Sequence, residues 1–245
     1  ASVEKIEHHT WKIEAKKIEK TDIPSELSKK IRASILFAGP LVARAGKAVM
    51  PPPGGDVIGR RRLDTHFLAL QELGARITVD GPFTFTANKL VGADLFLDET
   101  SVTATENAVM AAVLAEGRTK ITNAASEPHV QDLCNMLVAM GAKISGIGSN
   151  ILVIDGVKKL HGVDFSIGPD FMEIGSYIGL AAATKGSITI TGVRAEDMRP
   201  LRVAFGKLGI TWTIEGDTLT VAVGQEMKVN TDLGGMIPKI DDSPW

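Results

Sequence analysis

The chain has 245 residues, of which 44% are hydrophobic and 23% charged, the usual mixture for a globular protein with a large core. Its formal net charge of −2 excludes a general attraction to nucleic acid or to an anionic membrane. A single cysteine, Cys134, excludes an internal disulfide framework. No apolar run approaches the roughly 20 residues needed to span a bilayer and no signal peptide is evident, so we expect a cytoplasmic protein.

In chain order, the first predicted element is a pair of strands at the N-terminus. Ala1 there matches the alanine that follows a glycine further along the chain, at Ala75 and again at Ala142. Alanine-rich helices are then predicted over residues 31–45, 103–116 and 172–184. Because these helices are apolar around most of their circumference, we expect sheets to cover them on more than one side.

The sequence repeats with a period of about 70 residues. One series of glycines ends amphipathic helices that precede two alternating strands, and a second series follows the alanine-rich helices and precedes one strand. Each unit therefore reads strand, helix, strand, helix, strand, strand, with helices inside and sheets outside. The chain begins and ends within a unit, so we expect a fragment of a longer protein. The first series is Gly74, Gly141 and Gly209, and the second is Gly46, Gly117 and Gly186.

The segment VMPPPGGDVIGRRRLDTHF, residues 49–67, combines a proline- and glycine-rich loop with a cluster of charge. Residues 44–62 carry a charge of about +4, because five cations accompany a single carboxylate, Asp56. Guanidinium groups match phosphate and carboxylate in a bidentate manner, so the cluster favours an anionic ligand. Prolines and glycines also simply shape connectors, and the glycine spacing is not that of a Walker loop. The cations are Arg44, Lys47, Arg60, Arg61 and Arg62.

Polar side chains also occur at predicted helix starts. Arg32 opens the helix of residues 31–45, the segment ETSVTATEN (99–107) leads into the next apolar helix, and Asp170 precedes the helix of residues 172–184. The first turn of a helix offers free N–H groups to an anion, but the same polar groups can serve only as caps. Glu127, between Ser126 and Pro128, likewise needs no catalytic role.

The histidines and the cysteine predict no metal site. His8 and His9 are adjacent and are expected on opposite faces of a strand, and Asp64 and His66 have no third ligand near them in the sequence. Cys134 belongs to an apolar helix face and is expected to be inert core.

Taken together, these segments resemble the enolpyruvyl transferases, and within them the members that use a UDP-sugar, over essentially the whole chain. The family fold implied is α/β: two domains, each of three βαβαββ units packed as an inside-out α/β barrel. Residues 1–168 then form most of a catalytic-type domain and residues 169–245 part of a second. The resemblance rests on residues 32–66 (RASILFAGPLVARAGKAVMPPPGGDVIGRRRLDTH), 101–128 (SVTATENAVMAAVLAEGRTKITNAASEP), 140–146 (MGAKISG) and 169–176 (PDFMEIGS).

The resemblance implies transfer of the enolpyruvyl group of phosphoenolpyruvate to the 3-hydroxyl of UDP-N-acetylglucosamine, the first committed step of peptidoglycan synthesis. It implies no cofactor, no metal, and neither nucleic acid nor membrane as a partner; it fixes no oligomeric state. Arg32 falls in the nucleotide-sugar site and Arg61 where phosphoenolpyruvate binds, while Glu127 and Asp170 are further candidates. The residues implied to line the UDP-sugar are Arg61, Arg62, Leu63, Asp64 and Thr65, followed by Glu99, Thr100, Ser101 and Val102.

Asp56 stands where most members of the family carry the loop cysteine, and some members use aspartate. The implied role is that of a general acid facing C3 of phosphoenolpyruvate on a loop that closes over the ligand. The incoming anion engages the arginines and closure removes water, and both changes favour a protonated carboxyl on Asp56. Phe171 replaces the arginine usual at its position, which leaves the local ion pairing at the domain crossing undefined. Several reactant-binding residues of the family lie outside this chain, so we expect little turnover from it alone.

Three alternatives remain at this point. The first is 3-phosphoshikimate 1-carboxyvinyltransferase-like chemistry, although PPPGGDVIGRRRLD fits the UDP-sugar branch better. The second is a UDP-sugar-binding paralogue without catalysis. The third, an RNA-end-processing protein built on related repeats, is disfavoured by the net charge of −2 and the lack of a basic stripe.

Overall fold

The computed structural model describes residues 1–56 and 62–240, and these form two compact units. The larger unit contains Ala1–Ser126 and Leu133–Val163, and the smaller one contains Glu127–Asp132 and the chain from Asp164 onward. One helix, α5 (Pro128–Ala139), contributes residues to both units. The domain limits predicted above, 1–168 and 169–245, concern the complete protein and stay a prediction. No helix within the described ranges has the length and apolar character needed to cross a membrane.

Three sheets share one strand order, which confirms the internal repeat. In each, the strand that follows the alanine-rich helix pairs antiparallel with the last strand of the next hairpin, so that last strand lies in the middle. The three sets, in spatial order, are β3 (Lys47–Met50), β5 (Phe83–Thr86) and β4 (Arg76–Val79); β7 (Arg118–Thr122), β9 (Ile151–Asp155) and β8 (Lys143–Ser145); and β10 (Ile188–Ile190), β12 (Thr218–Val221) and β11 (Thr213–Glu215).

The middle repeat shows the complete predicted order. Strand β6 (Asp94–Phe96) is followed by α4 (Val102–Ala112), β7, α5, β8 and β9, and β6 joins its sheet in parallel beside β7. In the first repeat a parallel bridge between Asp22 and Val49 occupies the place of the first strand. The remaining helices are α1 (Ser25–Ser28), η1 (Arg32–Phe37), α2 (Ala38–Ala45) and α3 (Asp64–Glu72) in the first repeat, and α6 (Phe171–Ala183), η2 (Ala195–Met198) and α7 (Arg199–Lys207) in the third.

Left-handed backbone at the helix ends explains the repeated glycines. Gly74, Gly141 and Gly209 have φ values of 95°, 100° and 77°, a conformation in which a side chain is strained. Gly186 of the second series departs from this pattern. There Lys185, with φ 55°, takes the left-handed conformation one residue earlier.

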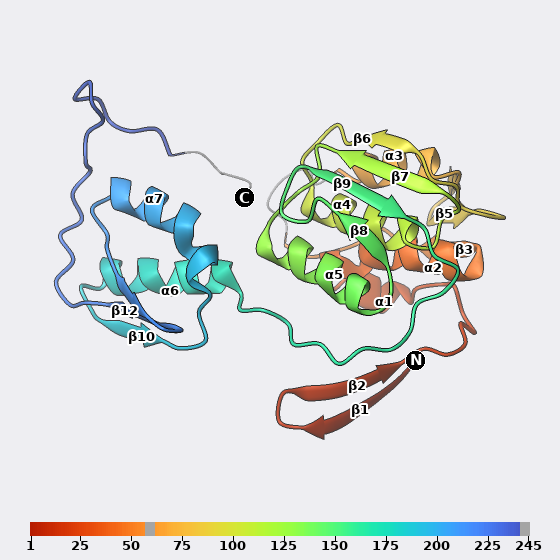
Figure 1. Ribbon diagram of the computed structural model, residues 1–245, viewed down its shortest axis with the longest axis horizontal. Helices are drawn as coiled ribbons and strands as arrows, with labels where there is room; N and C mark the ends of the chain where they lie inside the picture. Colours follow the sequence, from red (N-terminus) through yellow and green to blue (C-terminus); the bar gives the residue numbers. More distant parts are fainter. Residues whose placement is uncertain (57–61, 241–245) are drawn as a thin grey trace. The chain divides into compact units, whose positions relative to one another are not determined.

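Helix α4 occupies the centre of the larger unit, where it packs against η1, α2, α3 and β9 (Figure 1). Its residues Ala104, Ala108 and Val109 are fully buried. Small side chains allow α2 to approach closely, and a Cβ atom added at Gly39 would lie 2.5 Å from the carbonyl oxygen of Asn107. Helix α4 is covered on more than one side, but mainly by the helices η1, α2 and α3 and by one strand, β9, so the expectation that sheets cover it on more than one side is not confirmed.

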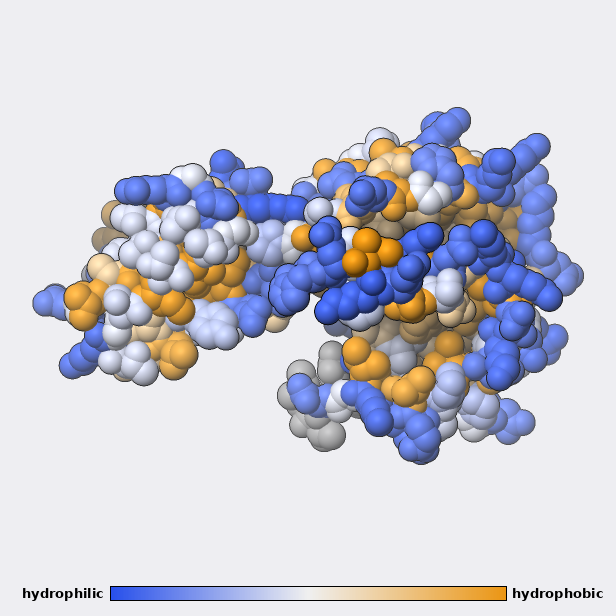
Figure 2. Space-filling model, turned by 90° about the horizontal axis from the view of Figure 1, so that it is seen from below, coloured by the Kyte–Doolittle hydropathy of each residue, from blue (hydrophilic) through white to orange (hydrophobic). Residues whose placement is uncertain are grey.

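Helix α6 of the smaller unit is less buried than the sequence predicts for residues 172–184. Met172, Tyr177 and Leu180 are 64%, 44% and 55% exposed, and apolar surface of this unit is visible in Figure 2. The reason is that the described residues provide one three-stranded sheet and α7 as cover, so one face of the helix has no neighbour. The expectation that sheets cover this helix on more than one side is wrong for these residues.

The N-terminal strands β1 (Ser2–Glu7) and β2 (Thr10–Glu14) form a hairpin whose residues are all exposed. His8 and His9 occupy its turn, and His9 has a φ of 68°. Since the strand ends at Glu7, the prediction that these histidines point to opposite faces of a strand is wrong.

Candidate functional site

A polar cavity of about 300 Å³ brings together side chains from three separate segments of the larger unit. These segments are the first residue of η1, the residues around the start of α3 and the residues around the start of α4. Five of the residues predicted to bind a UDP-sugar share this cavity, although they come from positions far apart in the sequence. The lining residues are Arg32, Arg62, Thr65, His66, Glu99, Ser101 and Thr103.

The segment before α4 is held in place by its own hydroxyl groups. Ser101 caps the helix, since its Oγ accepts a hydrogen bond from the Ala104 N–H at 3.3 Å. Thr105 Oγ1 donates to the Ser101 carbonyl at 2.7 Å and accepts from the Ala125 N–H at 3.0 Å. The helix therefore begins with a fixed backbone, and its positive dipole end lies at the cavity.

Two arginines supply the positive charge of the cavity. The Arg32 guanidinium donates through Nη2 to the Arg62 carbonyl oxygen at 2.9 Å, which ties η1 to the segment before α3. Arg62 forms an ion pair with Asp64. The Glu99 carboxylate also lines the cavity, and Thr65 Oγ1 donates to Asp98 Oδ1 at 2.7 Å at its edge. Guanidinium groups beside a helix N-terminus suit a phosphate or carboxylate group.

His66 and Thr103 line the cavity but were not predicted from the sequence as ligand contacts. His66 is 2% exposed, and its ring nitrogens lie 3.2 Å from Thr103 Oγ1 and 3.0 Å from Asn107 Nδ2. Burial, followed by the positive charge of Arg32, lowers the pKa of His66 from 6.5 to about 4. A sequence signal existed, because Thr103 and Asn107 are four residues apart on one helix face and His66 directly follows Thr65, a predicted UDP-sugar residue.

The other predicted UDP-sugar residues that the structure describes do not line this cavity. Leu63 is 8% exposed and its side chain belongs to the hydrophobic core. Thr100 Oγ1 donates to Asn123 Oδ1 at 2.8 Å, and Val102 is the first residue of α4. Asp64, the first residue of α3, is engaged by Arg62. Arg61 lies outside the described residues.

Asp56 is exposed and follows a segment that packs against the start of η1. The Gly54 N–H donates to the Ser28 carbonyl at 2.9 Å, and a Cβ atom at Gly54 would lie 1.6 Å from the Lys29 carbonyl oxygen. A Cβ atom at Gly55, whose φ is 97°, would lie 3.2 Å from the Arg32 backbone nitrogen. These glycines therefore permit close contact with the segment that carries Arg32, in addition to the mobility expected from them.

The two further candidates, Glu127 and Asp170, belong to the smaller unit and directly precede helices there. Asp170 Oδ1 accepts from the Met172 and Glu173 N–H groups at 2.9 and 3.1 Å at the start of α6. The Glu127 carbonyl accepts from Gln131 at the start of α5, while its Oε2 is buried without a hydrogen-bond partner among the described residues. Capping therefore has a structural basis for the Asp170 side chain but not for the Glu127 carboxylate.

Phe171 stands where the family usually has an arginine, and the ion pair found near it is formed by other side chains. Asp132 accepts from Arg194 Nη1 at 2.9 Å through Oδ1 and from the Gly168 N–H at 2.8 Å through Oδ2. Phe171 stacks on His129 with ring centroids 5.8 Å apart and an interplanar angle of 8°.

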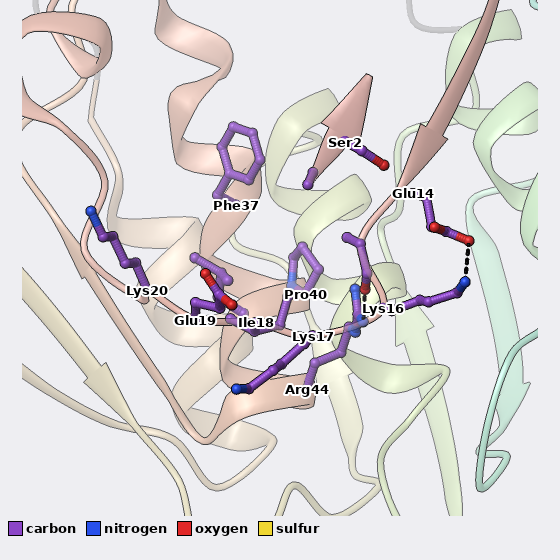
Figure 3. Close-up of a pocket in the computed structure, with 13 residues that line it drawn as sticks. Ser2, Glu14, Lys16, Lys17, Ile18, Glu19, Lys20, Phe37, Pro40 and Arg44 are labelled. Atoms are coloured by element: carbon purple, nitrogen blue, oxygen red, sulfur yellow. Dashed lines mark hydrogen bonds and ion pairs between the residues drawn. The ribbon is translucent and has the colours of Figure 1, made fainter. Parts of the chain in front are cut away.

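A second cavity of the larger unit, of about 640 Å³, lies between residues 14–20 and helix α2 (Figure 3). Lys16 and Glu14 form an ion pair at 3.1 Å at its rim, and Arg44 Nη2 donates to the Ala15 carbonyl at 2.6 Å. Despite its larger volume, it contains none of the residues that the resemblance implies for the substrates.

Cys134 is buried and reduced, as expected of a core residue. Burial, with a smaller effect of Glu106, raises the pKa of its thiol to about 12. Clusters of three or more His, Cys, Asp or Glu side chains placed to hold a metal ion do not occur among residues 1–56 and 62–240.

The α/β repeats bring together a cationic cavity at a helix start, and such a cavity suits an anionic ligand. A sequence profile of EPSP synthase (3-phosphoshikimate 1-carboxyvinyltransferase) matches residues 1–237. The chain belongs to this family of enolpyruvyl transferases.

Curated relatives of high identity carry one name, UDP-N-acetylglucosamine 1-carboxyvinyltransferase. The protein of that name from Treponema denticola is 70% identical over 242 residues, which are 99% of this chain and 57% of the relative. The one from Treponema pallidum is 62% identical over 244 residues, or 100% of this chain and 57% of the relative. The chain thus spans little more than half the length of these relatives.

Solved structures agree with the fold. The enolpyruvyl transferase NikO from Streptomyces tendae superimposes with a TM-score of 0.69 at 23% identity, covering 82% of this chain and 49% of the other. An EPSP synthase from Acinetobacter baumannii gives 0.56 at 20% identity, covering 78% and 45%. The predicted class, an α/β fold of βαβαββ units as in the inside-out barrels of this family, is confirmed.

Proposed function

We propose that the complete protein transfers the enolpyruvyl group of phosphoenolpyruvate to the 3-hydroxyl of UDP-N-acetylglucosamine, releasing phosphate, as a step of peptidoglycan synthesis. The observation that carries this proposal is the meeting of Arg32, Arg62 and the start of α4 in one cavity. The identity of 70% to a relative with the corresponding name supports the choice of UDP-sugar.

The residues of the cavity have separate roles in this proposal. Arg32 and Arg62 bind the negative charge of the nucleotide sugar by bidentate hydrogen bonds, and Ser101 and Thr65 add hydroxyl groups at the two helix starts. Glu99 accepts hydrogen bonds from sugar hydroxyls. Arg61, for which sequence resemblance is the basis, binds phosphoenolpyruvate.

Asp56 is proposed as the general acid. It donates a proton to C3 of phosphoenolpyruvate while the sugar 3-hydroxyl attacks C2 and gives its own proton to a base of the complete protein outside this chain, forming a tetrahedral intermediate. C3 then returns a proton to the Asp56 carboxylate as phosphate leaves C2, which restores the double bond in the product. The loop before Asp56 packs against the segment of Arg32, so closure over the ligand can bring the carboxyl to the anion that Arg32 binds.

This reaction requires neither a metal nor a cofactor, and its two substrates are the partners that we propose. The cytoplasm is the proposed compartment, because the single cysteine is a free thiol and not part of a disulfide. The domains proposed for the complete protein, with limits at residues 168 and 169, place the cavity in the first of them.

Calorimetry with the complete protein tests the proposal. UDP-N-acetylglucosamine is expected to bind and shikimate 3-phosphate is not, and Arg32→Met is expected to weaken binding tenfold or more, since a charged hydrogen bond is worth about 1.5–3 kcal/mol. Arg76→Met, which changes an exposed arginine on β4, is the matched control and should leave the affinity unchanged. Equal affinity of the wild type and Arg32→Met would contradict the site.

Release of phosphate from phosphoenolpyruvate in the presence of UDP-N-acetylglucosamine distinguishes a transferase from a protein that only binds the sugar. We expect release by the complete protein and its loss in Asp56→Ala. Tight binding with no phosphate release from the wild type would favour the non-catalytic alternative.

A further inference from the structure

The side-chain amide of Asn107 is fully buried, and its orientation is fixed by the groups around it. Its Oδ1 accepts a hydrogen bond from the Gly39 N–H at 2.8 Å. Its Nδ2 therefore faces the Ile35 carbonyl at 2.9 Å and His66 Nδ1 at 3.0 Å. Exchanging the two amide atoms would oppose a donor to the Gly39 N–H and an acceptor to the Ile35 carbonyl, so this orientation alone satisfies the surroundings.

This orientation determines the tautomer of His66. An amide NH₂ group can only donate, so His66 Nδ1 must be the unprotonated nitrogen that accepts. In the neutral ring the hydrogen then resides on Nε2, which lies 3.2 Å from Thr103 Oγ1. Burial and the neighbouring Arg32 disfavour the charged ring, which lowers the pKa of His66 and keeps this tautomer at neutral pH.

The hydroxyl group of Thr103 is consequently left with a hydrogen to donate. Its oxygen accepts from His66 Nε2–H, and among residues 1–56 and 62–240 no further hydrogen bond involves this hydroxyl. Thr105, two residues later, differs because its hydroxyl already donates to the Ser101 carbonyl. Thr103 is half-buried in the wall of the cavity that contains both arginines, so its hydrogen is available to a ligand there.

We propose that Asn107 and His66 form a relay that orients the Thr103 hydroxyl to donate a hydrogen bond to an anionic oxygen of the UDP-sugar bound in this cavity. The proposal rests on the function proposed above and adds a residue that contacts the ligand, Thr103, and two positioning residues. His66 acts through Thr103 and takes no proton from the substrate. The acceptor is an oxygen of the diphosphate, because Arg32, Arg62 and the α4 N-terminus collect negative charge at this place.

The first test is the protonation of the His66 ring in the complete protein, read from ¹⁵N chemical shifts and couplings to the ring protons at neutral pH. We expect an unprotonated Nδ1 and a protonated Nε2. A protonated Nδ1 or a charged ring would overturn the proposal. This measurement needs no ligand and is independent of the proposed reaction.

The second test is the affinity for UDP-N-acetylglucosamine of two variants at position 103. Thr103→Val keeps the shape of the side chain without the hydroxyl and is expected to weaken binding roughly threefold to tenfold, the range for a neutral hydrogen bond. Thr103→Ser keeps the hydroxyl and is expected to retain the affinity. Unchanged binding by Thr103→Val, with a wild type that binds, would refute the role of Thr103 and leave the proposed function intact.

A double-mutant cycle tests whether His66 acts through Thr103. His66→Gln should weaken binding by a similar factor in the wild type and cause no further loss in Thr103→Val, because the two residues serve one hydrogen bond. Independent, multiplicative losses would show that His66 has only a structural role and would overturn the relay. If the wild type itself fails to bind the UDP-sugar, the proposed function and this inference both fall, and the ring tautomer remains as a separate fact about the fold.

Discussion

Asn107 Nδ2 lies 3.0 Å from His66 Nδ1 across 41 positions of sequence, and this contact joins the two helices whose N-terminal ends form the cavity. The same amide binds the Gly39 N–H near the start of α2 and the Ile35 carbonyl in η1. Neither α2 nor α3 has a side-chain cap at its own N-terminal boundary. Asn107 therefore acts from another helix as a cap for α2, because its Oδ1 accepts a hydrogen bond from a free N–H group in the first turn of that helix.

Replacing Asn107 by leucine is expected to lower the free energy of unfolding of the 245-residue chain by about 3 kcal/mol or more. The buried Gly39 N–H and Ile35 carbonyl would lose their partner, and each unsatisfied buried group costs about 1–3 kcal/mol. Urea denaturation measures the change. Asn88→Leu, at an exposed position, is the control and should stay within about 0.5 kcal/mol of the wild type. A loss of the same size in both variants would contradict the buried network.

The imidazole of His66 is expected to titrate only near pH 4 in the native protein, because its pKa falls from 6.5 to about 4 on folding. Between these values the unfolded chain binds a proton that the native chain does not, so stability falls as pH falls through this interval. The contribution of His66, fully present above pH 6.5, is about 3 kcal/mol over the whole interval.

Proton NMR of the ring follows this titration directly, and urea denaturation at pH 7 and pH 4.5 follows its effect on stability. In His66→Gln the loss of stability between these two pH values should be smaller than in the wild type. A native ring that titrates near pH 6.5 would contradict the burial and charge environment described here.

Two glycine-to-alanine substitutions are expected to change stability in opposite directions. Gly39→Ala introduces a Cβ atom 2.5 Å from the Asn107 carbonyl oxygen. Because this oxygen belongs to the backbone of α4, the contact can be relieved only if α2 and α4 move apart. We expect a loss of about 2 kcal/mol or more by analogy with overpacked cores. At Gly206 in α7 nothing lies within 4 Å of the added atom, so Gly206→Ala should be neutral or stabilise by up to about 1 kcal/mol. Thermal unfolding of both variants measures these changes in stability. Equal effects of the two substitutions would refute the close approach of α2 to α4.

Loss of the Arg194 side chain is expected to loosen residues 164–170 of the smaller unit. Asp132, whose side chain is 15% exposed, would keep only its hydrogen bond from the Gly168 N–H. Because Arg194 is itself 38% exposed, solvent screening limits the loss to about 1–2 kcal/mol. Limited proteolysis should cut Arg194→Met faster than the wild type between residues 164 and 170. Arg199→Met, at an exposed arginine at the start of α7, should be cut at the wild-type rate.

The complete enzyme is expected to resist epoxide antibiotics of the fosfomycin type, and Asp56→Cys is expected to become sensitive while it keeps activity. A carboxylate is a poor nucleophile toward an epoxide carbon, whereas a thiolate is a strong one. Time courses of inhibition and intact mass of both forms provide the measurement. Cys134 is an internal control, because its burial and its pKa of about 12 keep it unmodified. A drug adduct on the Asp56 form, or an active Asp56→Cys form that is never alkylated, would refute the assignment.

The repeat, the order of elements along each unit and the segments that carry candidate binding residues could be predicted from the sequence. These features depend on local physics: the alternation of apolar residues, the left-handed backbone at Gly74 and Gly141, and the polar groups at the start of α4. Resemblance to a family then predicted five residues that the structure brings to one cavity: Arg32, Arg62, Thr65, Glu99 and Ser101.

Only the tertiary structure decided how buried each helix is and which polar atoms face one another. The apolar pattern of α6 predicts a covered helix, yet Leu180 is exposed because burial depends on neighbours that the pattern does not specify. In the same way, Asn107 and His66 read locally as an ordinary helix amide and an isolated histidine. The tautomer of His66 and its contact with Thr103 depend on hydrogen bonds between residues 37 and 41 positions apart in the sequence. Which atom donates and which accepts in these bonds is determined only when the helices pack together.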